Sequence, residues 1–383
     1  METIEQILEQ RKKDALLRVL TPAQSRQNGR IHLAGKEYYD FSSNDYLGLS
    51  NHPKLKEAVK KATNLYPVGS CASRLLSGDL NIHHELEEKT AQLKGKQSAL
   101  VFNSGYQANI GIISGLYGKA DAILADKLSH ASILDGIALS GARCYRFHHN
   151  DSNHLETLLK KTDNKFTNRL IVTESLFSMD GDKAPLKELV ELKNKYNCKI
   201  MIDEAHATGI FGKNGSGLIE QTGLTDSIDL IMGTFSKGLG GFGGYLASSS
   251  IIIEYLINTC RSFIYSTSLP ACIIAANLAA LELLKTEPNR RKTLIENADY
   301  FRTQLKAKGF HVTGSSQIVP LIVNDTEKAL AMSKHLAQKG FRALAIRPPT
   351  IPAGQSRIRF SLTYHHNKKI LQNLTQELEK YYV

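Results

Sequence analysis

The chain has 383 residues, of which 42% are hydrophobic and 22% are charged, a composition that excludes an intrinsically disordered protein. Its length exceeds that of one average domain and predicts a large domain with a smaller partner. The net charge of +11 is compatible with a basic solvated surface or with anionic substrates, and because no basic run is interleaved with aromatic residues we expect no nucleic acid partner.

Signals for secretion, membrane insertion and metal binding are weak in this sequence. The five cysteines form no CxxC pair and are odd in number, which favours reduced thiols in a cytoplasmic protein over a disulfide framework. The first 20 residues are charged throughout and lack the apolar core of a signal peptide. The longest apolar stretch, 271–284, is too short to cross a bilayer, so we expect a core helix and no membrane partner. The paired histidines at 83–84, 148–149 and 365–366 lack metal-binding spacing, and we expect no metal site.

The predicted elements begin with an N-terminal segment and a long alternating region. Residues 1–45 contain an amphipathic helical pattern from Ile4 to Leu20 and a short β segment that ends at Phe41. In residues 46–284, short apolar runs alternate with helical patterns, which predicts a large α/β domain with a mostly parallel sheet. We expect its strands at 99–102, 122–125, 143–147, 170–173, 199–202, 230–232 and 244–247.

The pattern changes in residues 285–383, which predict a smaller α+β domain. We expect helices at 291–308, at 328–339 and from 368 onward, and strands at 318–323, 342–346 and 357–362. Arg357 and Arg359 alternate along the last of these strands and therefore share one face. An arginine there could bind a substrate carboxylate or form a structural salt bridge.

Two motifs that each follow an apolar run carry the clearest chemical signal. Asp203-Glu204-Ala205-His206 follows the run at 200–202, and Thr234-Phe235-Ser236-Lys237-Gly238 follows the run at 230–232. Because ligands of parallel α/β sheets bind just outside the carboxyl ends of the strands, we expect Asp203, His206 and Lys237 to converge on one crevice. A pyridoxal phosphate enzyme needs such a set: a lysine for the Schiff base, a carboxylate for the pyridine nitrogen and a flat group against the ring.

A phosphate site is predicted at the first strand-to-helix turn, Ser104-Gly105-Tyr106. The turn precedes a helical pattern at 107–116, and a helix N-terminus offers free N–H groups and a positive dipole end to an anion. Tyr106 could instead be a core or capping residue. His130 follows the next predicted strand and is either a structural residue or a group that stacks on a pyridine ring.

Two other functions suggested by short motifs lack the required context. The segment 203–206 also spells a helicase box, but the nucleotide-binding loop is missing, because Gly212-Lys213 is followed by Asn214. The segment 238–243 satisfies G-x-G-x-x-G, but a strand follows it instead of a helix. A nucleic-acid-binding ATPase stays the alternative of a different class, and a colourless protein that hydrolyses ATP would favour it.

Seven motifs spread over nearly the whole chain share the pattern of one enzyme family. They lie at 41–48, 104–109, 128–132, 177–182, 203–209, 234–238 and 265–270. With them the chain resembles the α-oxoamine synthases, which use pyridoxal phosphate to condense an amino acid with an acyl thioester and release CO₂. The resemblance implies pyridoxal-phosphate transferase fold type I, with residues 46–284 as the cofactor-binding domain.

The resemblance also implies a role for each candidate residue of the cofactor site. Lys237 would form the Schiff base, Asp203 would pair with the pyridine nitrogen, and His130 would stack on the ring. His206 and Ser178 would contact the phenolic oxygen of the cofactor.

Four further positions match cofactor contacts of the family, namely Gly105, Tyr106, Thr234 and Thr267. In the family the position of Thr267 reaches the phosphate bound by the neighbouring subunit. The resemblance therefore implies a homodimer with shared sites.

On the substrate side, Asn44 and Arg359 match groups near the amino acid carboxylate, Thr350 a substrate contact and Arg18 an acyl-chain contact. The segment 345–352 is most similar to the members of biotin biosynthesis that join L-alanine to pimeloyl-CoA or pimeloyl-acyl carrier protein. Glycine C-acetyltransferase and 5-aminolevulinate synthase stay alternatives. Two departures from the pattern of many members are Glu204 in place of Asp and the segment Ser70-Cys71-Ala72-Ser73-Arg74-Leu75 in place of a glycine-rich one.

Overall fold

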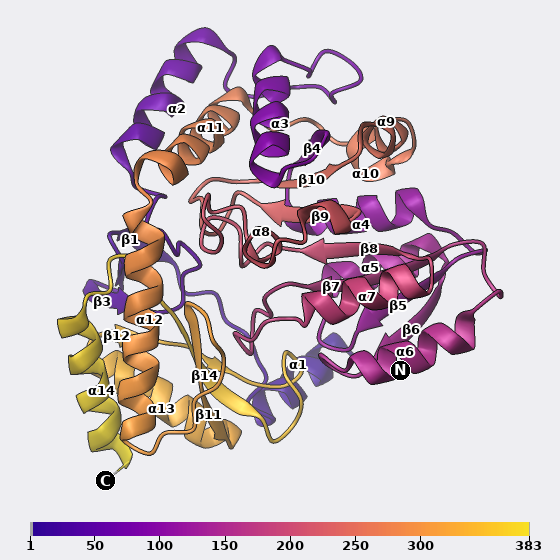
Figure 1. The fold of residues 1–383 in the computed structure, drawn as a ribbon. Coiled ribbons are helices and arrows are strands. Elements are labelled where there is room, and N and C mark those ends of the chain that lie inside the picture. Colours follow the sequence, from indigo (N-terminus) through magenta and orange to yellow (C-terminus); the bar gives the residue numbers. More distant parts are fainter. Residues whose placement is uncertain (1–2, 383) are drawn as a thin grey trace. The chain divides into compact units, whose positions relative to one another are not determined.

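The computed structural model describes residues 3–382, which form two compact units (Figure 1). The large unit comprises Asp45–Phe177 and Lys183–Lys292, and the small unit comprises the chain up to Asn44, Ser178–Asp182 and the chain from Thr293 onward. The N-terminal segment thus groups with the C-terminal segment, an association that the sequence pattern does not indicate. The three-part division at residues 45 and 284 stays a prediction.

The large unit is built on a seven-stranded sheet with the order β4-β10-β9-β8-β7-β5-β6. Strand β10 is antiparallel to its neighbours β4 and β9, and the other neighbouring pairs are parallel. All seven strands were predicted from the sequence, and all but the largely exposed edge strand β6 are apolar runs, because a strand that is covered on both faces is apolar along most of its length. The strands are β4 Ser98–Phe102, β5 Ala122–Asp126, β6 Arg143–Phe147, β7 Arg169–Glu174, β8 Lys199–Asp203, β9 Leu230–Thr234 and β10 Gly244–Ser248.

Helices cover both faces of this sheet. On one face α4, α5, α9 and α10 join the strands in a single apolar cluster. Within the described residues, α3, α6 and α7 contact the strands but add nothing to that cluster, so they cover the other face (Figure 1). The helices of this unit are α2 Pro53–Leu65, α3 Asn81–Lys94, α4 Gly105–Leu116, α5 Ala131–Ser140, α6 Ser152–Thr162, α7 Leu186–Lys195, α8 Leu218–Thr222, the 3₁₀ helix η1 Thr225–Ser227, α9 Ser250–Thr259, α10 Arg261–Ile264 and α11 Ala271–Thr286.

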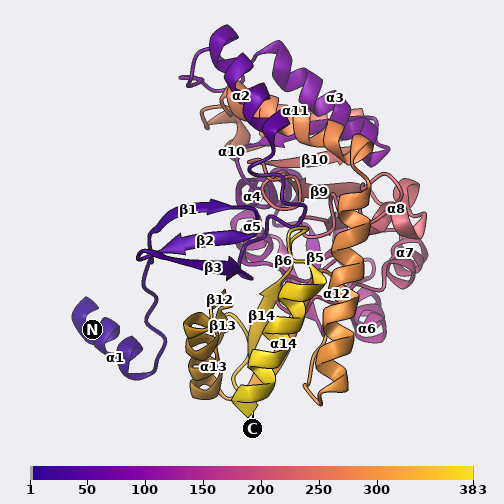
Figure 2. The same cartoon turned by 90° about the vertical axis from the view of Figure 1, so that its left-hand side faces the viewer.

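The small unit contains two sheets, with the orders β1-β2-β3-β12 and β11-β14-β13, beside the helices α12, α13 and α14 (Figure 2). The parallel pairing of β12 with β3 joins the C-terminal part of the chain to the N-terminal strands. Phe360 packs edge-on against Phe41 and Phe301, with ring centroids 5.9 and 5.3 Å away, and all three are buried. The elements are α1 Ile4–Lys13, β1 Ala23–Gln27, β2 Arg30–Leu33, β3 Lys36–Asp40, α12 Asn289–Ala307, β11 Ile318–Asn324, α13 Thr326–Gln338, β12 Phe341–Arg342, β13 Ala345–Ile346, β14 Ser356–Ser361 and α14 Lys368–Tyr382.

Two expectations for the small unit differ from the structure in extent. The helix predicted from Ile4 to Leu20 ends at Lys13, because Ala15 adopts a left-handed backbone with φ +55 that an α-helix cannot continue. The single strand predicted at 342–346 is divided into β12 and β13, which pair in different sheets. None of the helices within residues 3–382 has both the length and the apolar character that a membrane crossing requires.

Candidate active site

The parallel strands of the large unit end in polar side chains along one edge of the sheet. Strand β7 ends at Glu174, β8 at Asp203 and β9 at Thr234, and all three residues are buried. Glu174 and Asp203 are directly paired residues of adjacent parallel strands. Parallel α/β sheets bind ligands at this edge, so these three residues lie where the topology favours a ligand site.

Lys237 lies in the loop that follows β9, next to an imidazole. Its Nζ is 2.9 Å from the Nε2 of His206, and the Nδ1 of His206 is 2.6 Å from the hydroxyl oxygen of Tyr46. The loop is tightly turned, since the Gly240 N–H donates to the Lys237 carbonyl at 3.0 Å. The structure thus brings together the lysine and the histidine that two separate motifs supplied.

A hydrogen-bonded chain connects Asp203 with His130. The Asp203 carboxylate accepts the Ala205 N–H at 2.8 Å and the Asn109 side-chain amide at 3.0 Å. The same Asn109 amide donates to the Ser132 hydroxyl at 2.9 Å, and this hydroxyl is 2.7 Å from the Nδ1 of His130. The predicted pyridine partner and the predicted stacking group are therefore held by one network.

Two titratable groups at this edge have shifted pKa values. Burial raises the pKa of Glu174 well above its ordinary value, and the neighbouring Asp203 carboxylate raises it further. Burial thus favours the protonated form of Glu174 relative to an exposed carboxyl group. Partial burial lowers the pKa of His130, and the Asp203 carboxylate opposes this only in part. A neutral, flat His130 ring is suited to stacking on an aromatic ring.

The N-terminus of α4 has the features of an anion site. Ser104 caps the helix, with its hydroxyl accepting the Gln107 N–H at 3.1 Å, and the other N–H groups of the first turn have no acceptor within the helix. A Cβ added to Gly105 would lie 2.5 Å from the Cγ2 of Thr234, so only glycine lets the helix begin this close to the end of β9. Tyr106 is half exposed, and its ring meets that of His130 edge-on with centroids 6.3 Å apart.

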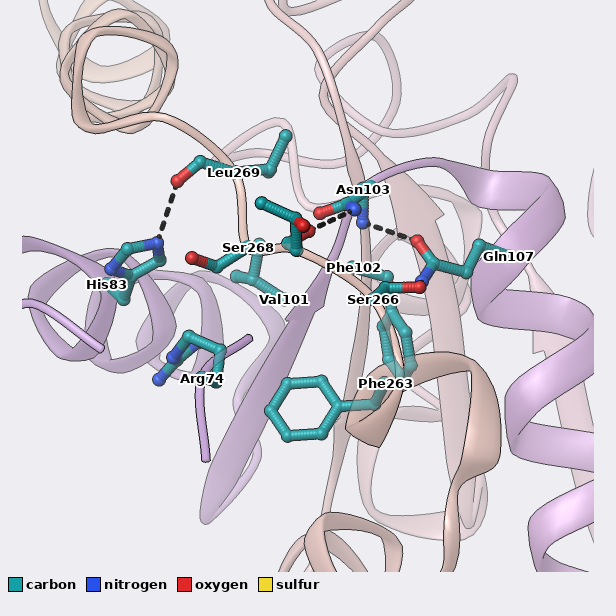
Figure 3. A pocket seen from close by; sticks show the side chains of 11 residues that line it. Arg74, His83, Val101, Phe102, Asn103, Gln107, Phe263, Ser266, Ser268 and Leu269 are labelled. Carbon is teal, nitrogen blue, oxygen red and sulfur yellow. Dashed lines mark hydrogen bonds between the residues drawn. The ribbon is translucent and has the colours of Figure 1, made fainter. Parts of the chain in front are cut away.

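Thr267 lies beside the strand that leads into this helix. The side-chain amide of Asn103 donates to the Thr267 carbonyl at 2.7 Å (Figure 3). In the same small cavity the Gln107 amide donates to the Ser266 hydroxyl at 2.9 Å, and the ring of His83 is 3.0 Å from the Leu269 carbonyl. The Thr267 carbonyl is thus held by Asn103 and the preceding Ser266 by Gln107, while Thr267 itself is exposed.

In the small unit, three of the predicted site residues contact one another. Arg359, which is buried on β14, donates to the carbonyl of Ser178 and, at 3.2 Å, to the side-chain oxygen of Asn44. Its neighbour Arg357 forms a salt bridge with Asp180. Arg357 therefore has the structural salt bridge that was one of the two expectations for this pair, whereas binding of a substrate carboxylate by Arg359 stays a prediction.

The two remaining candidate residues of the small unit, Arg18 and Thr350, also contact each other. The Arg18 guanidinium donates to the Thr350 hydroxyl at 3.2 Å, and both residues are exposed. Arg347 donates to the carbonyl of Leu17 at 3.0 Å and so holds the segment of Arg18 beside the loop of Thr350.

Comparison with known proteins identifies the family. The model for aminotransferase class I and II matches residues 36–378. The chain belongs to this family. It is 46% identical to 8-amino-7-oxononanoate synthase of Geobacter sulfurreducens over 95% of this chain and 94% of that protein.

Two solved structures extend the comparison. A serine palmitoyltransferase variant from S. paucimobilis, solved with a pyridoxal phosphate adduct of myriocin, has a TM-score of 0.92, 32% identity and coverage of 98% of this chain and 95% of that one. The crystal structure of 8-amino-7-oxononanoate synthase from Francisella tularensis has a TM-score of 0.77, 30% identity and coverage of 90% and 99%. The resemblance and the fold type I expected from the sequence are confirmed.

The carboxyl edge of the large unit fits the pyridoxal phosphate expected from the sequence. Among residues 3–382, the buried hydroxyl of Thr234 has no hydrogen-bond partner, and the methyl group of the same side chain lies against the start of α4, where a phosphate would be bound. Lys237 supplies an amine and Asp203 a carboxylate, the donor set that this cofactor requires. No cluster of metal-ligating side chains occurs among the described residues.

Sequence reasoning missed two residues that contact the predicted ones, Asn109 and Tyr46. Both lie inside family motifs, at 104–109 and 41–48. Asn109 lies four residues after Gly105 on α4, so the helix period directs it toward the same side, and this signal could have found it. Tyr46 and His206 are far apart in the sequence and contact each other only in the folded chain, so no local pattern could have predicted the contact.

Proposed function

We propose that this protein catalyses the decarboxylative condensation of L-alanine with a pimeloyl thioester, the 8-amino-7-oxononanoate synthase reaction of biotin biosynthesis, with pyridoxal phosphate as cofactor. The observation that carries the proposal is the 46% identity to such a synthase over nearly the full length of both chains. The contact between Lys237 and His206, next to Asp203, supports it with the required chemistry.

The residues of the large unit would hold the cofactor as follows. Lys237 would carry it covalently, Asp203 would keep a proton on its pyridine nitrogen, and His130 would lie against its ring. His206 would hydrogen-bond the phenolic oxygen, since its Nε2 already faces the Lys237 amine. The phosphate would be bound by the N-terminus of α4 and by the unpartnered hydroxyl of Thr234 described above.

Bound pyridoxal phosphate supplies an electron sink that stabilises negative charge at the substrate carbon next to the amino group. The chain must supply the base for that carbon. Lys237 is suited to this because it would carry the cofactor and its amine lies next to the imidazole of His206. His206, at 2.9 Å, can accept or return a proton at the same nitrogen.

We assign the substrate contacts to the small unit. Arg359 would bind the carboxylate of L-alanine, because its guanidinium is buried and fixed in direction by Ser178 and Asn44. Ser178 would also be near the phenolic oxygen of the cofactor. The exposed pair of Arg18 and Thr350 would bind the acyl chain, with the Arg18 charge suited to the distal carboxylate of a pimeloyl group.

The assembly that we infer is a cytoplasmic homodimer with two shared sites. Its basis is Thr267, which would contact the phosphate bound by the partner subunit. The contact of the Thr267 carbonyl with Asn103 fixes this segment at the anion site of its own chain, so a same-chain role for the threonine is the competing arrangement. A complementation experiment, described in the Discussion, distinguishes the two.

The test of the activity is turnover with defined substrates. Purified protein loaded with pyridoxal phosphate should release free thiol from pimeloyl-CoA with L-alanine, and mass spectrometry should detect 8-amino-7-oxononanoate. Glycine with acetyl-CoA, glycine with succinyl-CoA and L-serine with palmitoyl-CoA are the controls for the sibling activities. A faster reaction with any of these three pairs would reject the alanine and pimeloyl assignment while leaving the cofactor assignment intact.

A further inference from the structure

A fully buried lysine lies directly behind the cofactor site. Lys94 is the last residue of α3, and its side chain is 0% exposed. Its ammonium donates to the Glu204 carboxylate at 2.8 Å, to the Thr208 hydroxyl at 3.0 Å and to the Ser216 carbonyl. All three donors of the ammonium are therefore used, as burial of a charge requires.

The Lys94–Glu204 ion pair is charged, but a buried ion pair adds little to the free energy of unfolding. Burial alone would lower the pKa of Lys94, but the Glu204 carboxylate and Tyr245 together outweigh burial, and the pKa is raised. The second carboxylate oxygen of Glu204 accepts the Ile219 N–H at 2.9 Å. Buried ion pairs gain little over apolar replacements, because the desolvation of two charges offsets their attraction. We therefore expect the pair to have a role other than stabilising the fold.

The pair closes the turn that carries the catalytic histidine. The Glu204 carbonyl accepts the N–H groups of Ala207 and Thr208, both at 2.9 Å, and also the Thr208 hydroxyl at 3.0 Å. Because its ammonium contacts both the Glu204 carboxylate and the Thr208 hydroxyl, Lys94 links the first and last residues of the turn. His206 lies between these ends, with its Nε2 2.9 Å from the Lys237 Nζ.

The same turn also touches the loop of the catalytic lysine. A Cβ added to Gly238 would lie 2.8 Å from the Thr208 carbonyl oxygen, so the turn and the loop after Lys237 are in close contact. The Thr208 hydroxyl is 2.9 Å from the hydroxyl of Tyr245, whose ring packs against Phe235 with centroids 5.0 Å apart. Thr208 therefore contacts Lys94 of the ion pair, the loop that follows Lys237, and Tyr245.

We propose that the Lys94–Glu204 pair is a positioning device, which holds the 204–208 turn so that His206 and Asp203 keep their places relative to Lys237. The role rests on the proposed function, because it assumes that the cofactor is bound at Lys237. The pair does not touch the reacting atoms. It acts through the turn and sets how tightly, and in which protonation state, the cofactor is held.

The first test replaces the ion pair by a neutral pair, Lys94→Met/Glu204→Gln, beside the single change Lys94→Met. The single change leaves an unpaired buried carboxylate and should lower the melting temperature strongly, and the double change should recover most of that loss. The double variant should nevertheless bind pyridoxal phosphate about tenfold more weakly and titrate its visible absorbance at a shifted pH, by about half a unit or more. A double variant with the parent's cofactor affinity and titration midpoint would reduce the pair to a structural role.

A second pair of variants decides the question if the double variant fails to fold. Thr208→Val keeps the shape of the side chain but removes the hydroxyl that joins Lys94 to the turn, whereas Thr208→Ser keeps the hydroxyl. Cofactor affinity should fall about threefold to tenfold in the valine variant and return toward the parent value in the serine variant. Equal affinities and equal titration midpoints in the two variants would overturn the proposal.

The parent protein separates this outcome from failure of the proposed function. A parent that binds no pyridoxal phosphate at Lys237 would refute the cofactor assignment itself. A parent that binds it normally, with all variants matching it in affinity and absorbance, would refute only the positioning role.

Discussion

The narrow space at the start of α4 makes a steric prediction for Gly105→Ala. The new Cβ would lie 2.5 Å from the Cγ2 of Thr234 and 3.0 Å from the Cε of Met232, and methyl carbons in contact are normally about 3.5–4.0 Å apart. The apo protein can relieve the overlap by moving α4 away from β9. Binding the phosphate requires the original position, so the strain falls on cofactor binding.

Overpacking of this kind costs about 1–3 kcal/mol, which corresponds to an affinity for pyridoxal phosphate about 5-fold to 140-fold weaker. The assay is a fluorescence or absorbance titration of apo protein with the cofactor. Thr234→Ser removes the clashing methyl and keeps the hydroxyl, so Gly105→Ala/Thr234→Ser should recover much of the affinity.

The control is Gly118→Ala, because a Cβ there would meet no atom of residues 3–382 within 4 Å. This variant should bind the cofactor as the parent does. Parental affinity in Gly105→Ala, or a double variant weaker than both single ones, would refute the steric account of the anion site.

Three further predictions concern Asp203, Thr267 and His366. Asp203→Asn should leave the fold intact and lower turnover by about a thousandfold or more, because a neutral amide cannot keep a pyridine nitrogen protonated, and near-normal kcat would show that Asp203 has another role. Lys237→Ala mixed with Thr267→Asp should regenerate activity in verified heterodimers if sites are shared, since one site then has an intact lysine and threonine, whereas persistent inactivity would favour the same-chain arrangement. Burial lowers the pKa of His366 to about 3, so folding favours its neutral form and stability is lost as pH falls below about 6.5. Urea unfolding should show a loss of about 1.4 kcal/mol between pH 7.5 and 5.5 that is absent from His366→Phe, and parallel pH dependences would contradict it.

The sequence predicted the central sheet well because its strands, apart from the edge strand β6, are buried on both faces and therefore apolar along most of their length. The seven predicted strands of the large unit all occur, and the motifs at 203–206 and 234–238 lie at carboxyl ends of β8 and β9 as expected. The topology then brings Lys237 and His206 together, since their strands are neighbours in the sheet.

Local sequence patterns could not predict three features of the structure. The apolar residues after Lys13 continue a helical pattern, but Ala15 breaks the helix and no residue type there signals it. The two-residue strands β12 and β13 have no periodicity of their own and are defined by their partners. No sequence pattern distinguishes Lys94 from a solvated lysine, and only the fold shows that its ammonium is buried against Glu204.

The central claim is that Lys237 carries pyridoxal phosphate, and borohydride reduction tests it most directly. Reduction makes a lysine–cofactor bond permanent, and peptide mapping by mass spectrometry then identifies the modified residue. The account predicts loss of the visible absorbance of the protein and a single cofactor-modified peptide that contains Lys237, with Lys237→Ala unmodified. A modified peptide that carries the cofactor on another lysine, or a protein that shows no covalent cofactor after loading, would contradict it.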